Sequence, residues 1–316
     1  MEPDRWLGIE LRHLAALQAV GAERSFGRAA RRLGYTQSAV SQQIATLERI
    51  VGQRLLERPG GPRPVSLTEA GRLLVRHAEA IVARLDAAEA DFRALSEGEA
   101  GTLRIGTYQS VGNKILPTLL MRFREQWPDV EIKLTESAND SELLGLVERG
   151  DLDLAFIIYP LVEGPFEVVQ LMRDPYVLVV PTESELARRD APPTAKEIAE
   201  LPLIGFRQCR SLQQVESYFT GRGLELNVVF RSDDNGTVQG LVGAGFGNAL
   251  VPGLAIVDAH DPRVAVRDID PRVPQRLIGI AWHRDRYRTP ASRAFVELAQ
   301  EVCAEFEREQ GQAAAA

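Results

Sequence analysis

The sequence predicts an α/β protein in which a short helical module is followed by a long helix and by a larger domain of alternating strands and helices. Arginines are concentrated between Leu11 and Leu67, and an apolar pattern with helical spacing follows them. From Thr102 onward, short apolar strands alternate with helical patterns. We therefore expect three segments, which are residues 9–67, 68–98 and 101–308.

Length and composition restrict the class of protein. A chain of 316 residues can form two domains, each with a core of its own. No apolar run is long enough to span a membrane, and the start "MEPDRWLGIE" lacks the apolar segment of a secretory signal. Two cysteines, Cys209 and Cys303, are too few for a disulfide framework. We expect a cytoplasmic protein with no membrane partner.

Charge is distributed unevenly along the chain. The net charge is -7, yet the segment from Leu11 to Leu67 holds nine arginines and three acidic residues, a formal +6 that leaves -13 for the rest. The guanidinium group fits phosphate oxygens and guanine edges. A basic module joined to an acidic body favours a DNA-binding head, with a merely solvated basic surface as the alternative.

The basic module has the pattern of a helix-turn-helix. A first helix begins at Leu11, Ser25 is a suitable N-cap for a second helix, and Gly34 ends it. Thr36 is the N-cap of a third helix, whose residues Val40 and Ile44 are spaced to face a core. Two short helices joined by a turn that contains glycine indicate this motif.

The opposite face of the third helix is polar but uncharged. Its first turns present amides and hydroxyls, which can pair with base edges in a major groove without adding sequence-independent attraction. An uncharged solvated face is the alternative. We expect the base contacts to come from Thr36, Gln37, Ser38, Ser41 and Gln42.

A loop with the sequence "PGGP" follows, between two short predicted strands. Arg58 and Arg63 stand on either side of it, so the loop resembles a wing that reaches a phosphate or a minor groove. We include both arginines among the DNA-binding residues.

These residues identify a family. The stretch "SFGRAARRLGYTQSAVSQQIATLERIVGQRLLER" and the following "SLTEAG" resemble the winged helix-turn-helix of LysR-type transcriptional regulators from Ile9 to about Gly71. Two positions depart from the family pattern. Ser38 stands where proline is usual, and Gln42 stands where arginine is frequent, so base reading is expected to differ in detail.

Thr68 is the predicted cap of a long helix that runs to about Glu97. Its apolar residues Leu74, Ile81 and Leu85 begin a stripe with coiled-coil spacing. A single helix cannot bury this stripe by itself. We therefore expect the stripe to pack against the same helix of a second chain. Packing against its own domain is the alternative. The family resemblance implies antiparallel pairing of these helices, in a homodimer or homotetramer.

The C-terminal pattern of strand, helix and strand predicts parallel sheets in two α/β halves. The stretches "LRIGTYQSVGNKILP", "LVERGDLDLAFI" and "LVGAGFGNALVP" resemble the effector domain of LysR-type regulators, which is itself similar to periplasmic solute-binding proteins. In "GAGFG" the helix precedes the strand, which is the reverse of a dinucleotide site, so we expect no nucleotide there.

Ligands of such domains bind beyond the carboxyl ends of parallel strands. There the sequence offers hydroxyls, amides, an apolar wall and one possible anion partner, Arg207. Capping and turn roles are the alternative for each residue. The predicted effector contacts are Ser110, Val111, Ser137, Asn139, Phe206 and Arg207.

No catalytic, metal or cofactor set emerges. The four histidines lack metal-ligand spacing, and no serine lies in a nucleophile elbow. A peroxide-sensing branch of the family carries a reactive cysteine near the position of Cys209 and a second one several residues later. This chain has no second cysteine there, so we do not expect that switch.

The sequence therefore predicts a regulator that binds double-stranded DNA at an interrupted dyad near a promoter. A small effector in the cleft is expected to change DNA bending or contacts with RNA polymerase. The competing hypothesis is a solute-binding or carrier protein whose N-terminal head serves only for oligomerisation.

Overall fold

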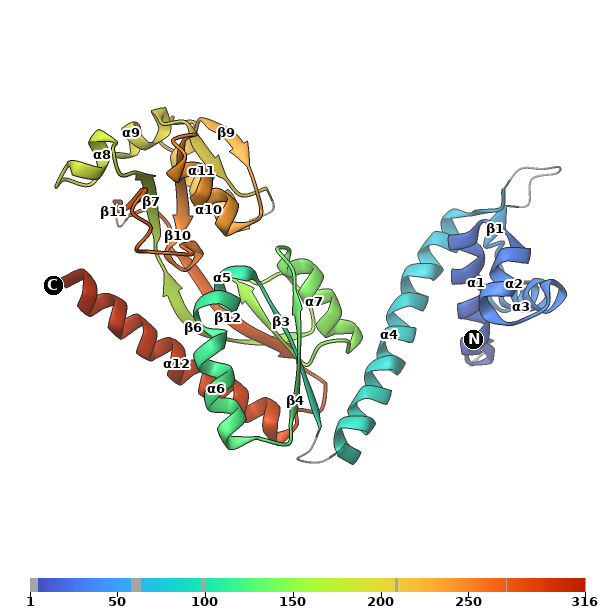
Figure 1. Cartoon of the computed structure of the whole chain (residues 1–316). Helices are drawn as coiled ribbons and strands as arrows, with labels where there is room; N and C mark the ends of the chain where they lie inside the picture. Colours follow the sequence, from blue (N-terminus) through green and yellow to red (C-terminus); the bar gives the residue numbers. More distant parts are fainter. Residues whose placement is uncertain (1–4, 58–63, 98–100, 208–209, 271, 316) are drawn as a thin grey trace. The chain divides into compact units, whose positions relative to one another are not determined.

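The computed structural model describes residues 5–57, 64–97, 101–207, 210–270 and 272–315 (Figure 1). It forms two compact units, Met1–Glu89 and Ala90–Ala316, which are described one at a time. None of the helices in these ranges combines the length and apolarity that a membrane span needs.

Three helices form the N-terminal unit, α1 (Leu11–Glu23), α2 (Phe26–Leu33) and α3 (Gln37–Val51), after a short 3-10 turn, η1 (Arg5–Gly8). The predicted caps are present. Ser25 Oγ accepts a hydrogen bond from the Arg28 amide at 3.4 Å, and Thr36 Oγ1 accepts one from the Ala39 amide at 3.2 Å. Gly34 ends α2 in the left-handed region, at φ 70°.

The core of this unit lies where the three helices meet. Leu17 of α1, Ala29 of α2, and Ile44 and Leu47 of α3 are all fully buried. Since the alanine side chain is small, α2 can approach its neighbours closely. This packing turns the first residues of α3 outward.

A two-stranded antiparallel ribbon, β1 (Leu56–Glu57) and β2 (Ser66–Leu67), follows α3. The predicted loop between these strands, with Arg58 and Arg63, lies outside the described residues. Thr68 then caps α4 (Glu69–Glu97), where its Oγ1 accepts from the Gly71 amide at 3.0 Å. A Cβ at Gly71 would lie 2.1 Å from the Leu55 carbonyl oxygen, so only glycine fits the first turn of α4.

The apolar stripe of α4 changes its environment along the helix. Leu74 is 6% exposed and belongs to the core of the N-terminal unit, whereas Ile81 and Leu85 are each 45% exposed and Phe92 is 75% exposed. Large apolar side chains at this level of exposure are available to a partner.

The first lobe of the C-terminal unit contains a sheet of five strands in the order β4-β3-β5-β12-β6. Helices α6 and α12 pack on one face with β3, β5 and β12, and α7 packs on the other face. The elements of this lobe are β3 (Thr102–Thr107), α5 (Gln109–Lys114), α6 (Leu116–Gln126), β4 (Glu131–Glu136), α7 (Asp140–Arg149), β5 (Leu154–Ile158), β6 (Phe166–Asp174), β12 (Arg276–His283) and α12 (Pro290–Ala315).

The second lobe has a sheet in the order β11-β7-β10-β8-β9. Its helices also cover both faces, with α9 and α10 in one apolar cluster and α11 in the other. The elements are β7 (Tyr176–Pro181), α8 (Glu185–Arg188), α9 (Ala195–Glu200), β8 (Leu203–Gly205), α10 (Arg210–Thr220), β9 (Val228–Arg231), α11 (Asn235–Gly243), β10 (Asn248–Pro252), the 3-10 turn η2 (Gly253–Ala255) and β11 (Val264–Asp268).

Both sheets are mixed, which corrects the prediction of parallel sheets. Strands β3, β4 and β5 run parallel, as do β8, β9 and β10, but β12 runs antiparallel to β5 and β6, and β7 runs antiparallel to β10 and β11. Two crossings cause this, because the chain leaves the first lobe after β6 and returns to it at β12. Between β3 and β4 the chain forms two helices, the short α5 and then α6.

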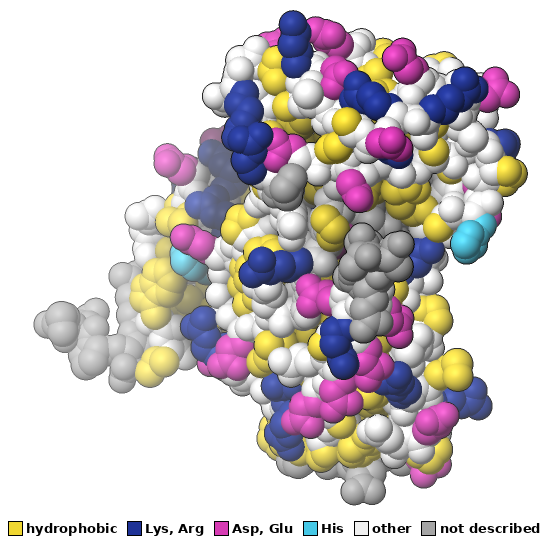
Figure 2. Space-filling view, turned by 90° about the vertical axis from the view of Figure 1, so that its left-hand side faces the viewer, with side chains coloured by type: hydrophobic (Ala, Val, Ile, Leu, Met, Phe, Trp, Pro, Cys, Tyr) yellow, Lys and Arg dark blue, Asp and Glu magenta, His cyan; other side chains and the backbone are white. Residues whose placement is uncertain are grey.

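Charged side chains of both signs are interspersed among apolar ones over the face that Figure 2 presents. Such a mixed surface is typical of a solvated globular protein.

Candidate functional site

The first turns of α3 present the predicted uncharged face. Gln37, Ser38 and Gln42 are exposed and Ser41 is half-buried. The Thr36 hydroxyl caps the helix and also lies 3.0 Å from the Ser38 hydroxyl. Val40 is fully buried on the opposite side, which holds this face outward. The amides and hydroxyls are therefore placed to reach the base edges of a groove.

Arginines of the N-terminal unit lie close to this face along the sequence. Arg28 and Arg32 pair with Glu23 at 3.4 and 3.6 Å, and both side chains remain more than half exposed. Exposed pairs of this kind contribute little to stability, so the guanidinium groups can exchange a carboxylate for a phosphate at small cost. Their charge is available for nucleic acid.

A cavity of about 230 Å³ opens between the two lobes of the C-terminal unit. Its wall combines apolar and aromatic side chains with hydroxyl, amide and carboxylate groups, the mixture that small-molecule sites use. The lining residues are Tyr108, Gln109, Ser110, Glu136, Ala138, Ile158, Phe206, Asp233, Asp234, Asn235, Ala255 and Arg276.

A buried ion pair connects the cavity wall to the lobe crossings. Arg276, at the start of β12, is 4% exposed, and Asp174, at the end of β6, is 1% exposed. The Arg276 guanidinium donates through Nε to Asp174 Oδ2 at 2.8 Å and through Nη2 to the same oxygen, and Nη2 also donates to Ser110 Oγ at 2.9 Å.

The second carboxylate oxygen of Asp174 reaches the other lobe, because Oδ1 accepts from the Leu254 amide of η2 at 3.0 Å. Burial raises the pKa of Asp174, and the Arg276 charge and the Leu254 amide oppose that shift. The network links Ser110 of the cavity to both lobes through charge-assisted hydrogen bonds.

Gln109 of α5 forms a second bridge between the lobes. Its Nε2 donates to Asp234 Oδ2 at 2.8 Å, and its Oε1 accepts from the Asn235 amide at 2.8 Å. Asp234 is the N-cap of α11 and accepts from the Thr237 amide at 2.6 Å. The hydrogen bond from Gln109, followed by those from Thr237, lowers the pKa of Asp234 below its ordinary value. Asp234 is thus held as a carboxylate at the cavity edge.

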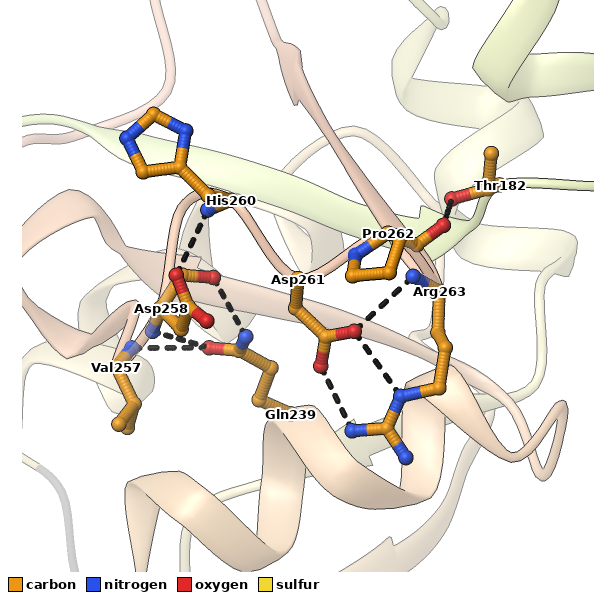
Figure 3. A network of polar contacts seen from close by, with 8 residues as sticks. All are labelled: Thr182, Gln239, Val257, Asp258, His260, Asp261, Pro262 and Arg263. Carbon is orange, nitrogen blue, oxygen red and sulfur yellow. Dashed lines mark hydrogen bonds and ion pairs between the residues drawn. The ribbon is translucent and has the colours of Figure 1, made fainter.

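A polar network holds the middle of α11 in place through Gln239 (Figure 3). Gln239 Oε1 accepts from the amides of Val257 and Asp258 at 2.9 and 3.2 Å, and Gln239 Nε2 donates to the Asp258 carbonyl at 2.7 Å. Nearby, Arg263 pairs with Asp261 at 2.8 Å and lowers the pKa of that carboxyl to about 2. The N-terminus of α11 therefore meets the cavity from a fixed helix.

Two of the predicted effector residues line the cavity, Ser110 with its buried hydroxyl and Phe206 as an apolar wall. Val111 is fully buried in the core of the first lobe. The Arg207 side chain is absent from the cavity lining, and its Nη2 donates to the Arg231 carbonyl at 3.5 Å.

The other predicted pair caps α7. Asn139 Oδ1 accepts from the Ser141 amide at 3.0 Å, and Ser137 Oγ accepts from the Asn139 amide at 3.1 Å and lies 2.7 Å from Glu142 Oε2. Their neighbours Glu136 and Ala138 reach the cavity instead. The local capping pattern fits the alternative that the sequence left open for these residues.

Sequence reasoning missed Arg276 and Asp174. Each is the terminal residue of a strand, and in the sequence an arginine or aspartate there is indistinguishable from a solvent-exposed strand end. Gln109 was missed for a similar reason, since nothing local distinguishes it from Ser110 beside it.

The described residues contain no group of three or more histidine, cysteine, aspartate or glutamate side chains suited to a metal ion. Cys303 is buried in α12, and this burial, followed by the charge of Glu307, raises the pKa of its thiol to about 12. The reactive thiolate form is therefore disfavoured. Cys209 lies outside the described residues.

Comparison with known proteins covers nearly the whole chain. Residues 11–72 match the family model "Bacterial regulatory helix-turn-helix protein, lysR family", and residues 96–304 match the "LysR substrate binding domain". The Hca operon transcriptional activator HcaR of Escherichia coli is 31% identical over 93% of this chain and 98% of its own length.

Solved structures agree with these matches. An OxyR mutant of Corynebacterium glutamicum is 27% identical, with a TM-score of 0.59 over 97% of this chain and 95% of its own. Full-length CbnR in complex with its target DNA shares the fold at 23% identity, with a TM-score of 0.63 over 93% of this chain and 99% of its own.

Proposed function

Because the chain belongs to the family of LysR-type transcriptional regulators, we propose that an effector held in the cavity between its C-terminal lobes controls its action at a promoter. Membership of this family makes it a DNA-binding transcriptional regulator with an effector-binding domain. It binds double-stranded DNA and a small effector, and it forms homo-oligomers. On the same ground we infer a cytoplasmic regulator without enzymatic activity.

In this proposal α3 enters the major groove. Its exposed amides and hydroxyls read bases, while arginines of the same unit and of the wing neutralise phosphates. The capped, outward-facing first turn of α3 supports this role. The proposed contacts are Thr36, Gln37, Ser38, Ser41, Gln42, Arg58 and Arg63.

The exposed stripe of α4 is the proposed seam between subunits. Ile81, Leu85 and Phe92 follow coiled-coil spacing and remain exposed in the single chain. Burying them against the same helix of a second chain removes apolar surface from water and gives a homodimer, which can pair further to a homotetramer. A dimer matches a DNA site with two half-sites.

The hydrogen bonds of Ser110 are the observation that carries the proposal for the effector. The Ser110 oxygen accepts from Arg276, which leaves its own proton to be donated into the cavity. An effector that accepts this proton alters a network that runs through Arg276 and Asp174 to the lobe crossings. Differential affinity for two lobe arrangements is then sufficient to shift their populations.

The remaining predicted contacts are proposed around this centre. Phe206 forms the apolar wall, and Val111, Ser137, Asn139 and Arg207 lie on the segments that carry the lining residues. We infer that the response changes DNA bending or contacts with RNA polymerase.

A thermal-shift screen of small metabolites tests the site. A compound at a concentration 100 times its dissociation constant adds roughly 2.7 kcal/mol, which raises the unfolding midpoint by about 5–11 °C. For the compound found, Ser110→Ala should weaken binding by about two- to thirteenfold, since one neutral hydrogen bond is lost. Ser110→Thr keeps the hydroxyl and should retain most of the affinity.

The matched control is Ser217→Ala, because the Ser217 hydroxyl donates to the Gln213 carbonyl within α10 and lies outside the cavity. It should bind the compound as the wild type does. Equal binding by Ser110→Ala and wild type, measured by isothermal titration, would place the effector elsewhere.

A further inference from the structure

Asn235 places a carboxamide at the wall of the cavity between the lobes. It is the first residue of α11 and is only 6% exposed. Its backbone amide donates to Gln109 Oε1, yet within the part of the chain that the structure describes no hydrogen bond engages its side chain. The side-chain oxygen and nitrogen are not sealed within the protein, and the residue borders the cavity. An amide that is almost completely buried and borders a cavity is placed to bind a group that enters it.

The neighbouring carboxamides differ from Asn235 in this respect. Gln109 uses both of its polar atoms to bridge the lobes. Gln239 uses both of its own to hold the segment of Val257 and Asp258. These two side chains therefore stabilise the fold itself. Because an amide buried without a partner costs free energy, the unpaired side chain of Asn235 favours a role in ligand binding over a role in stability.

An apolar recess of the second lobe opens beside Asn235. Its volume is about 10 Å³, which is room for one small group, and it shares Phe206, Asn235 and Ala255 with the main cavity. Apart from Gln239, the rest of its described wall is aliphatic and consists of Val179, Val238, Ala249, Val251 and Ile256. The carboxamide of Asn235 thus lies next to apolar surface, which suits a ligand that joins a polar head to an apolar body.

We propose that Asn235 recognises the effector from the second lobe, and that the effector carries an uncharged group with both a hydrogen-bond donor and an acceptor, such as a carboxamide, on an apolar body. Asn235 Nδ2 donates to the acceptor of this group, and Asn235 Oδ1 accepts from its donor. A group that has acceptors alone leaves Oδ1 unpaired and binds more weakly. The inference rests on the proposed function of the cavity as the effector site, and it adds a specificity-determining residue and the chemical class of the ligand.

The position of Asn235 also connects the ligand to the contact between the lobes. Ser110 offers its proton from the first lobe, and Asn235 offers its carboxamide from the second. The backbone amide of Asn235 donates across the lobe boundary to Gln109, so a ligand on Asn235 lies beside one of the bridges between the lobes. Its affinity then depends on how the lobes meet, which is the condition for shifting the populations of their arrangements.

Three probes of similar shape test the need for a donor and an acceptor, namely benzamide, acetophenone and benzoate. Benzamide offers both, acetophenone offers an acceptor alone, and benzoate offers two acceptors and a charge. In ligand-observed NMR titrations of the full-length protein, benzamide should bind about two- to thirteenfold more tightly than acetophenone, because one neutral hydrogen bond separates them. Equal binding of all three, absence of binding by all three, or a preference for acetophenone or benzoate overturns the proposal.

Two variants of nearly the same size assign this preference to Asn235. Asn235→Leu removes the donor and the acceptor, so the ratio of benzamide to acetophenone affinity should fall to about one. Asn235→Asp keeps an acceptor and loses the donor. Acetophenone then loses its hydrogen bond while the benzamide N–H donates to a carboxylate, so the ratio should be at least as large as in the wild type. A purely structural role of Asn235 would weaken both probes by the same factor in each variant, and that result contradicts the inference.

The matched control is Asn227→Leu, which removes an exposed amide of the second lobe outside the cavity and should leave the ratio unchanged. Phe206→Ala separates the inference from the proposed function. If it weakens benzamide while both Asn235 variants keep the wild-type ratio, the cavity remains the binding site and only the role of Asn235 is wrong. If Phe206→Ala and Ser110→Ala bind every probe as the wild type does, the proposed site fails with the inference. Unfolding midpoints measured without probe confirm that each variant is folded.

Discussion

The ion pair between Asp174 and Arg276 gives the most demanding prediction on stability. Removing one partner of a buried pair leaves an uncompensated charge and costs roughly 3–5 kcal/mol. Asp174→Leu removes the carboxylate that pairs with the Arg276 guanidinium, which is 4% exposed, and it also removes the acceptor of the Leu254 amide. For a domain of this size the loss lowers the unfolding midpoint by about 6–20 °C.

The double variant Asp174→Leu with Arg276→Met removes both charges at once. It still leaves the Leu254 amide without its acceptor, at about 1–3 kcal/mol. We nevertheless expect the double variant to be more stable than either single variant, because an apolar pair of similar volume replaces two buried charges at little net cost.

Tryptophan fluorescence during thermal unfolding measures these effects. Trp127 and Trp282 both pack against the core of the first lobe, and Trp6→Phe removes the signal of the N-terminal unit. The control is Asp151→Leu, since Asp151 forms an exposed pair with Arg149 at 3.3 Å. If Asp174→Leu lowers the midpoint no further than this control, or if the double variant is the least stable, the reasoning about the buried pair is refuted.

Three further predictions concern the other parts of the chain. Gln37→Ala should weaken binding to the specific DNA site by about 1–3 kcal/mol and leave binding to random DNA unchanged, and equal losses on both in fluorescence anisotropy would contradict base reading. Leu85→Asp should dissociate the oligomer in sedimentation, whereas Ala80→Asp, on another face of α4, should not; identical behaviour would move the seam elsewhere. Arg189 lowers the pKa of Glu197 from 4.5 to about 2 through their hydrogen bonds, so the carboxylate adds stability above pH 4.5 that is lost as the pH falls towards 2. Arg189→Met should flatten the pH dependence of the unfolding midpoint in that window, and an unaltered pH profile would show that this pair has no such role.

The sequence was sufficient for the parts of the fold that local rules determine. Ser25, Gly34 and Thr36 signal helix ends through their own backbone and side-chain chemistry, and the structure has helix boundaries at these residues. The family resemblance, and with it the two-lobed α/β architecture, is confirmed by the matches over both domains. The apolar spacing likewise predicted α4.

The mixed sheets were not predictable in the same way. The segment of β12, "RLIGIAWH", is apolar on both faces. The sequence of such a strand does not show whether it runs parallel or antiparallel to its neighbours. The direction is set by the crossing between lobes, which is a property of the whole chain. The site residues divide in the same way. Ser110 and Phe206, which the sequence predicted, line the cavity. Arg276 was not predicted, because its place in the cavity wall depends on its pairing with Asp174, which is 102 positions away in the sequence.

The central claim is that one chain reads DNA with its N-terminal unit and responds to a ligand in its C-terminal cavity. Fluorescence anisotropy on DNA from upstream of its own gene tests this most directly, with random DNA of equal length as competitor and with the compound from the thermal-shift screen added or omitted. We predict tighter binding to the upstream DNA than to random DNA, and a change in the complex on addition of the compound that Ser110→Ala reduces. Equal affinity for both DNAs, or the same ligand response in Ser110→Ala as in the wild type, would contradict the claim.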